Sequence, residues 1–297
     1  MQCVKPVLLL DKKTLRKFPE GLLVPCGKCS ACRIAYRRLW CIRLEHELYY
    51  NPDSMFLTLT YDEEHLPLNS SLQKQDLQKF FKRLRKRISP RKIKYFACGE
   101  YGDELERPHY HAIIFNLGLD RDSKFSVIDS WPFCDWDNEN IFRGSFGLVE
   151  PFSIQYVASY INKKLTGELA EEEYTKKNRE PVFRLMSNGL GKSFVLEFKD
   201  DLLRDKFIRY KGKEMCLPRY YISLLELNGA AALKQKAIDS DCDFVADTVG
   251  VYIQSDVLYH MSDSKMMRSL IERTDNIRKQ RSRNIEAKLQ LTKSSKF

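Results

Sequence analysis

Two runs of strand-forming residues separated by a short connection constrain the fold of this chain most. Residues 93–100 and 109–115 are rich in aromatic and apolar side chains, and Gly102 and Pro108 lie in the polar connection between them. Parallel strands need a crossover of a dozen or more residues, so strands joined this closely pair antiparallel. The sequence therefore predicts a β-hairpin over residues 93–115.

Two histidines on the second strand of this hairpin suggest chemistry. His109 and His111 are two residues apart, so both side chains point to the same face of the sheet and can converge on one ion. Glu100 lies at the end of the first strand, where an antiparallel hairpin returns it beside the histidines. Two imidazoles and a carboxylate suit a divalent cation that also holds a phosphate oxygen, which favours Mg²⁺ or Mn²⁺. The alternatives are Glu106 as the carboxylate, or two histidines on a half-buried strand without a metal.

Further elements follow from apolar periodicity. We expect a strand over residues 55–61 and helices over 31–50, 74–88, 154–165 and 221–238, with a solvated loop or lid over 166–181. The longest apolar runs are far below the roughly 18 residues that span a bilayer, and the first residues lack the features of a secretory signal. We therefore expect an intracellular protein with no membrane segment.

Clustered positive charge favours an acidic polymer as partner. The chain has 50 Lys and Arg against 40 Asp and Glu, a formal net charge of +10. We interpret this as nucleic-acid binding, the alternative being a basic surface without a partner. The last 33 residues carry ten basic and three acidic side chains and are expected to form a basic helix or a partly disordered arm. The helix over 74–88 has a basic outer face, with candidate DNA contacts at Lys82, Arg83, Arg85, Lys86 and Arg87.

A run of cysteines points to a structural metal. Cys26, Cys29 and Cys32 are separated by two-residue gaps, a spacing that lets consecutive sulfurs face one ion. The fourth ligand is Cys3, Cys41 or Cys98. Zn²⁺ is our choice, an Fe–S cluster is an alternative because it also uses closely spaced cysteines, and unligated thiols in a turn are the remaining one.

Two tyrosines share one face of the predicted helix over 154–165. Tyr156 and Tyr160 are four residues apart, and Lys163 follows three residues later. Aromatic residues at this spacing usually pack in a core, so the pattern acquires a catalytic meaning only beside the histidines. A tyrosine hydroxyl has a pKa near 10 in model peptides, so a nucleophilic tyrosine needs a nearby cation such as Lys163.

Three ordered motifs resemble a known family. MFLTLTYDEEHLP, RPHYHAIIF and YVASYINKK are similar to the three motifs of the HUH endonuclease superfamily, the rolling-circle replication initiators, and most closely to initiators of small single-stranded DNA phages of the microvirus type. The spacing in CGEYGDELERPHYHA also resembles that at which related initiators place their third metal ligand, Glu100. The similarity extends over about residues 3–221, and an N-terminal cysteine of the family corresponds to Cys3.

The resemblance implies a mechanism. Glu100, His109 and His111 would hold Mg²⁺ or Mn²⁺ on the scissile phosphate, and Tyr160 or Tyr156 would attack it to leave a 5′-phosphotyrosine and a free 3′-OH. The second tyrosine would allow strand transfer and closure of a circle. The partners implied are single-stranded and replicative-form DNA at a viral origin, with host helicase and DNA polymerase, in the host bacterial cytoplasm. We expect Thr58 and Thr60 to shape the sheet beside the metal or to touch DNA.

Other features limit the alternatives. Gly189-Leu-Gly191-Lys192-Ser193 resembles the end of a P-loop, but Met186 stands where the loop needs glycine, so we predict no ATPase. Rival functions are an HUH transposase or relaxase, where one tyrosine usually suffices, and a zinc-containing nucleic-acid-binding protein without chemistry.

The fold class that we predict is α+β. Its core is a central antiparallel sheet, similar to the RRM-like core of the HUH superfamily, with flanking helices and a basic helical C-terminal extension. The expected domain organisation is a cysteine cluster and basic helix over 1–50, the endonuclease core over 51–200 and a basic, mostly helical region over 201–297.

Overall fold

A computed structural model describes residues 3–4, 7–16, 22–102, 105–160, 170–226, 276–288 and 290. The chain forms two compact units, Met1–Tyr36 with Glu226–Phe297, and Arg37–Leu225. Within the described part of the chain, no helix combines the length and the apolar character needed to cross a bilayer.

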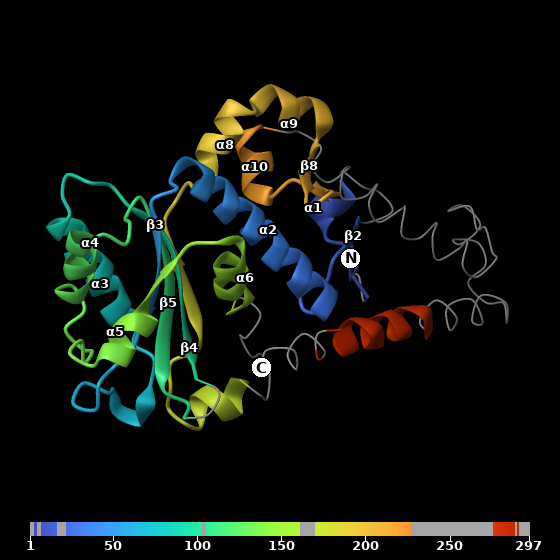
Figure 1. The fold of residues 1–297 in the computed structure, drawn as a ribbon. Coiled ribbons are helices and arrows are strands. Elements are labelled where there is room, and N and C mark those ends of the chain that lie inside the picture. Colours follow the sequence, from blue (N-terminus) through green and yellow to red (C-terminus); the bar gives the residue numbers. More distant parts are fainter. Residues whose placement is uncertain are drawn as a thin grey trace, which may run out of the picture. The chain divides into compact units, whose positions relative to one another are not determined.

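The larger unit is built on a five-stranded sheet (Figure 1). Its strand order is β6-β3-β5-β4-β7, and every neighbouring pair is antiparallel. The predicted hairpin is confirmed as β4 and β5, and the predicted strand over 55–61 is β3. Strand β5 lies between β3 and β4, so the helix that links those two parallel strands closes a split β-α-β unit. The strands are β3 (Ser54–Leu59), β4 (Lys94–Tyr101), β5 (Pro108–Phe115), β6 (Phe146–Leu148) and β7 (Phe183–Met186).

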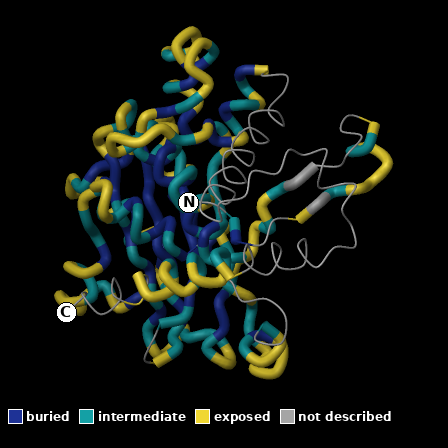
Figure 2. Tube along the Cα trace, turned by 90° about the vertical axis from the view of Figure 1, so that its right-hand side faces the viewer, coloured by how far each residue is buried: buried dark blue, intermediate teal, exposed yellow. Residues whose placement is uncertain are grey.

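Helices cover both faces of this sheet (Figure 1). On one face lie α3 (Lys74–Arg87) and α4 (Arg121–Ile128), and on the other lie α2 (Ser30–Tyr50) and α6 (Pro151–Ser159). The buried residues are concentrated in the strands between these layers, as Figure 2 shows. The α+β class with a central antiparallel sheet is confirmed. The predicted helices over 31–50 and 74–88 match α2 and α3 closely, because their apolar periodicity is strong.

Alternation along β5 separates the two faces. Tyr110, Ala112 and Ile114 belong to the core cluster formed with α3, whereas Ile113 and Phe115 belong to the cluster formed with α2 and α6. Successive side chains of a strand point to opposite faces, so His109 and His111 lie on the side of α6. The helix over 74–88 therefore packs on the face opposite to the histidines.

The remaining elements differ in part from the sequence predictions. Helix α6 begins at Pro151, earlier than predicted, because Pro at the first helical position and the Glu150–Ser153 capping box favour a start there. Residues 161–169 of the predicted helix, and those beyond 226 of the predicted helix over 221–238, lie outside the described residues. Part of the predicted loop over 166–181 is a π-helical turn, η3 (Glu171–Thr175), next to the i,i+4 ion pairs Lys176–Glu172 and Lys177–Glu173.

Short elements complete the described chain. Residues 276–288 of the basic tail are helical. The other elements are β1 (Val7–Leu9), α1 (Lys12–Leu15), β2 (Leu22–Val24), η1 (Leu68–Ser70), α5 (Glu139–Ser145), α8 (Lys192–Glu197), α9 (Lys199–Asp205), β8 (Phe207–Tyr210), β9 (Lys213–Cys216) and α10 (Arg219–Leu224).

The P-loop-like segment has a structural partner. The N–H of Gly191 donates to the buried carboxylate of Glu47 at 2.8 Å, and Lys94 Nζ contacts the same carboxylate at 2.8 and 3.0 Å. Gly191 has a φ of +77°, and a Cβ there would collide with the hydroxyl of Tyr221. This turn thus ties α2, β4 and the start of α8 together.

Candidate active site and cysteine cluster

Two of the three predicted metal ligands are in direct contact. Glu100 lies opposite His109 in the β4–β5 register, and His111 follows on the same face of β5. Oε1 of Glu100 is 3.0 Å from Nε2 of His111, and both residues are buried, with 5% and 6% of their surface exposed. A buried carboxylate beside a buried imidazole is costly without a compensating partner, which makes the pair a candidate functional site.

The two histidine rings are anchored through Nδ1. Nδ1 of His109 lies 2.8 Å from the carbonyl oxygen of Arg107, an acceptor only, so this nitrogen carries the proton and donates it. Nδ1 of His111 lies 3.1 Å from Oγ1 of Thr58, a hydroxyl that can donate or accept. Burial, the largest cause, lowers the pKa of His109 and favours the neutral imidazole that binds metals. Both Nε2 atoms thus remain available as ligands.

His109 lies farther from the pair than a finished metal site requires. Among the described residues, the one group of three or more Cys, His, Asp or Glu side chains whose donor atoms all lie within 4.8 Å of one another is formed by cysteines. Three ligands about 2 Å from one ion would be closer than that. The donor set of Glu100, His109 and His111 fits a divalent cation chemically, and its closure needs an adjustment of the His109 ring.

Both predicted tyrosines lie against this pair. The ring of Tyr160 stacks on that of His111, with centroids 5.0 Å apart and an interplanar angle of 7°. The ring of Tyr156 meets His111 edge-on at 5.3 Å and Tyr160 at 5.0 Å. Burial raises the pKa of Tyr160 above its usual range, and hydrogen bonds to Tyr156 and Glu100 raise it further. Tyr160 is therefore a neutral phenol here, held against the carboxylate of Glu100.

The other predicted site residues are dispersed. Lys163 lies outside the described residues. Thr58 contacts His111, whereas Oγ1 of Thr60 lies beyond the end of β3, 3.5 Å from Sγ of Cys134. The predicted DNA contacts of α3 lie on the opposite face of the sheet. These are Lys82, Arg83, Arg85, Lys86 and Arg87.

Two residues beside the site were not identified from the sequence. The Phe56 ring stacks at 6.0 Å on His111 and meets Tyr156 edge-on at 6.2 Å. It precedes Thr58 by two residues, so strand alternation could have placed it on the same face. Arg107 acts through its backbone carbonyl, for which the sequence holds no signal.

The smaller unit contains the predicted cysteine cluster. The sulfurs of Cys3, Cys26, Cys29 and Cys32 all lie within 4.8 Å of one another, so Cys3 supplies the fourth thiol. The Sγ–Sγ distance is 4.0 Å for Cys26–Cys32 and 3.9 Å for Cys29–Cys3. Tetrahedral zinc with bonds of about 2.3 Å requires sulfurs about 3.8 Å apart, so the cluster could hold such a metal. The other two candidates, Cys41 and Cys98, are buried in the hydrophobic cluster around Trp40 and Phe96.

Backbone amides support thiolate ligands in this cluster. The N–H of Cys26 donates to Sγ of Cys3 at 3.2 Å, and the N–H of Cys29 donates to Sγ of Cys26 at 3.4 Å. Burial opposes ionisation of Cys26, but hydrogen bonds from the Cys29 and Lys28 amides outweigh it and lower its pKa to about 6. Gly27 has a φ of +72°, which allows the tight turn that aims these amides at the sulfur.

Comparisons with known proteins point in one direction. A family model for replication-associated proteins of the ORF2 type matches residues 54–165, the segment that contains the hairpin and both tyrosines. The chain is 32% identical to Replication-associated protein VP4 of Bdellovibrio phage phiMH2K, over 74% of this chain and 76% of the relative. It is 32% identical to Replication-associated protein ORF2 of Spiroplasma virus 4, over 68% of each chain. No solved structure matches.

Proposed function

Because this chain belongs to the family of microvirus replication-associated proteins, we propose that it initiates phage DNA replication by nicking single-stranded DNA at the viral origin. The observation that carries this proposal is the position of Tyr160, whose ring stacks on His111 and whose hydroxyl is hydrogen-bonded to Glu100. A nucleophile, a carboxylate and an imidazole thus share one buried face of the sheet.

The proposed reaction is an attack of a tyrosine oxygen on the scissile phosphorus. The new bond joins this oxygen to phosphorus, and the bond from phosphorus to the 3′ oxygen breaks, which leaves a 5′-phosphotyrosine and a free 3′-OH. Tyr160 starts as a protonated phenol, and Glu100 is the acceptor in contact with it. The departing 3′ oxygen takes up a proton, so the charge balances. A divalent cation, Mg²⁺ or Mn²⁺, held by Glu100, His109 and His111 would supply charge stabilisation on the phosphate oxygens.

The second tyrosine supports strand transfer. The ring centroids of Tyr156 and Tyr160 are 5.0 Å apart, so a small movement of the DNA brings a second phosphate to the other hydroxyl. Tyr156 could cleave the regenerated origin, and the released 3′-OH would then attack the first phosphotyrosine and close a circle. Host helicase and polymerase, in the bacterial cytoplasm, would unwind the template and extend the first 3′-OH.

The test is formation of a covalent adduct. Wild-type protein is incubated with a labelled single-stranded library of the viral origin region and Mn²⁺ or EDTA, and the products are separated on a denaturing gel. We expect a protein-linked DNA band with Mn²⁺ and none with EDTA. DNA that is bound in a salt-sensitive manner but stays intact under both conditions would favour a nucleic-acid-binding protein without chemistry instead.

We also propose that Cys3, Cys26, Cys29 and Cys32 bind one structural Zn²⁺. Its role would be to fix the N-terminal segment, whose short elements bury little apolar surface.

A cysteine substitution tests this zinc site. The Cys29→Ser protein is expected to lose one equivalent of zinc, measured by metal analysis of the purified protein, because the serine hydroxyl is a poor ligand for zinc at neutral pH. Cys216→Ser, which replaces an exposed thiol outside the cluster, should keep it. Iron with visible absorbance in the wild-type protein would identify an Fe–S cluster and overturn the zinc assignment.

A further inference from the structure

A dense positive surface lies on the far side of the sheet from the candidate active site. Residues 74–92, which comprise α3 and the loop after it, include nine Lys or Arg and one acidic residue. Four exposed side chains follow the outer side of α3, and we call them the α3 basic face: Lys79, Lys82, Arg85 and Lys86. A row of cations along a helix is attracted to an anionic polymer.

The inner side of α3 fixes the direction of this face. Leu77, Phe80, Phe81 and Leu84 are at most 1% exposed and pack on the sheet together with Tyr110 of β5. His111, the next residue after Tyr110, lies on the other side of the sheet. The sheet and the core beneath α3 therefore separate the α3 basic face from Tyr160, and one DNA segment cannot run directly from one to the other.

The chemistry of the face favours a duplex over a single strand. Proteins that hold single strands stack aromatic rings on the bases, but the two aromatic residues of α3, Phe80 and Phe81, are buried in the core. The exposed side chains are flexible point charges, and the guanidinium of Arg85 lies 5.1 Å from the ring of Tyr95. Such side chains neutralise the phosphates of a duplex backbone without reading its sequence.

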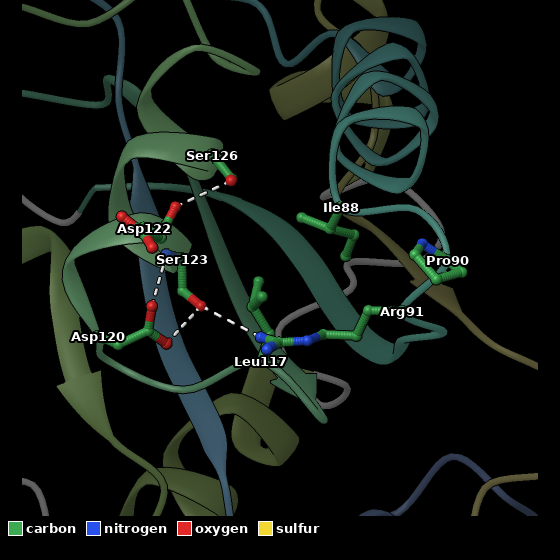
Figure 3. Close-up of a pocket in the computed structure, with 8 residues that line it drawn as sticks. All are labelled: Ile88, Pro90, Arg91, Leu117, Asp120, Asp122, Ser123 and Ser126. Carbon is green, nitrogen blue, oxygen red and sulfur yellow. Dashed lines mark hydrogen bonds between the residues drawn. The ribbon is translucent and has the colours of Figure 1, made fainter.

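The C-terminal end of α3 bounds this surface. Arg83 donates from Nε to the carbonyl of Ser130 at 2.8 Å, and Arg87 pairs with Asp129 at 2.7 Å, so both guanidinium groups are engaged with α4 and its C-terminal end. Beyond them a cleft of about 550 Å³ separates the end of α3 from α4. Arg91 reaches across this cleft to Ser123, which also bonds to Asp120 (Figure 3).

The acidic side of that cleft repels phosphate, so the anion-binding surface extends from Lys79 to Lys86. Within α3 itself, Asp76 lies 3.9 Å from Lys79. Among the described ion pairs, Lys82, Arg85 and Lys86 take part in none.

We propose that the α3 basic face binds the backbone of duplex DNA while the opposite face of the sheet holds the single strand that is cut. The second half of this statement rests on the proposed nicking function, and the first half does not. The protein then contacts two DNA segments at once, as an initiator at the junction between a replicative-form duplex and an exposed strand would need to.

The test replaces two cations in the middle of the face. Lys82→Glu/Lys86→Glu is compared with Lys199→Glu/Lys213→Glu, which makes the same change of charge at exposed positions of α9 and β9. Affinity for a non-origin 30-base-pair duplex is measured in EDTA against salt concentration. We expect at least about tenfold weaker binding for the α3 variant and a log–log salt slope lower by about 2, because each phosphate contact contributes about 0.9. The control variant should bind like the wild type.

A second measurement separates this proposal from the proposed nicking function. Adduct formation with a short single-stranded oligonucleotide and Mn²⁺ should be unchanged in the α3 variant. Duplex affinity equal to that of the wild type would overturn the proposal and would leave an acidic protein as the partner of this face. Loss of adduct formation in a variant that keeps its circular dichroism spectrum would also overturn it, because α3 would then act on the cut strand. If the wild-type protein formed no adduct at all, the duplex measurement in EDTA would still decide whether this face binds DNA.

Discussion

The Tyr156→Phe/Tyr160→Phe protein is expected to form no protein-linked DNA under conditions in which the wild type does. Phenylalanine keeps the rings that stack on His111 but removes both nucleophilic oxygens. With Tyr160→Phe alone, the first cleavage should be lost or strongly reduced, because Tyr160 is the tyrosine bonded to Glu100. With Tyr156→Phe alone, the adduct should still form, but closed circles should not. The measurements are a denaturing gel for the adduct and a ligation assay for the circles.

Tyr49→Phe provides the matched control. Tyr49 is 69% exposed on α2, so loss of its hydroxyl should leave the adduct unchanged. An adduct that persists in the double variant would remove the tyrosine assignment, and mapping of the linked peptide would then identify the true nucleophile. A circular dichroism spectrum like that of the wild type is required, since Tyr160 is largely buried.

The Trp131→Ala protein is expected to lose about 3–5 kcal/mol of unfolding free energy, a large part of the stability of a typical domain. Trp131 is fully buried, and its ring contacts those of Tyr61, Phe80, Tyr110 and Phe133 at centroid distances of 5.0 to 6.0 Å. Its indole N–H donates to the carbonyl of Thr60 at 2.8 Å, so truncation leaves both a cavity and an unpaired acceptor.

This loss is measured by urea unfolding followed by circular dichroism. Phe152→Ala, which truncates an aromatic residue that is 70% exposed, should change the unfolding free energy by no more than about 0.5 kcal/mol. A similar small change for Trp131→Ala would mean that the core beneath α3 closes around the cavity. Since Tyr110 precedes His111 directly, a larger loss would also show how strongly this core holds the histidine strand.

Local features of the site were predictable because each depends on neighbouring residues. Antiparallel closure of residues 93–115 brings Glu100 opposite His109, and strand alternation puts His111 on the same face. Helical spacing places Tyr156 and Tyr160 together in the same way. The apolar stripe of α3 was visible for the same reason.

Contacts between distant segments were not predictable from these patterns. Thr58 meets His111 because β3 pairs with β5 across 53 residues, and the spacing of the other three cysteines does not tell Cys3 from Cys41 or Cys98 as the fourth thiol. The sequence also assigned DNA contacts to α3 without showing that α3 and the histidines lie on opposite sides of the sheet.

The amino-acid sequence by itself determined which residues form the hairpin, the histidine pair and the tyrosine pair. Only the tertiary structure decided that α6 covers the face with His111 and that α3 covers the other one. Both faces of this sheet are apolar, with Leu57 and Ile114 on one and Phe96 and Ile113 on the other, so either face could bury the apolar stripe of either helix. Periodicity identifies the buried side of an element, but the choice of face depends on the connections and packing of the whole sheet.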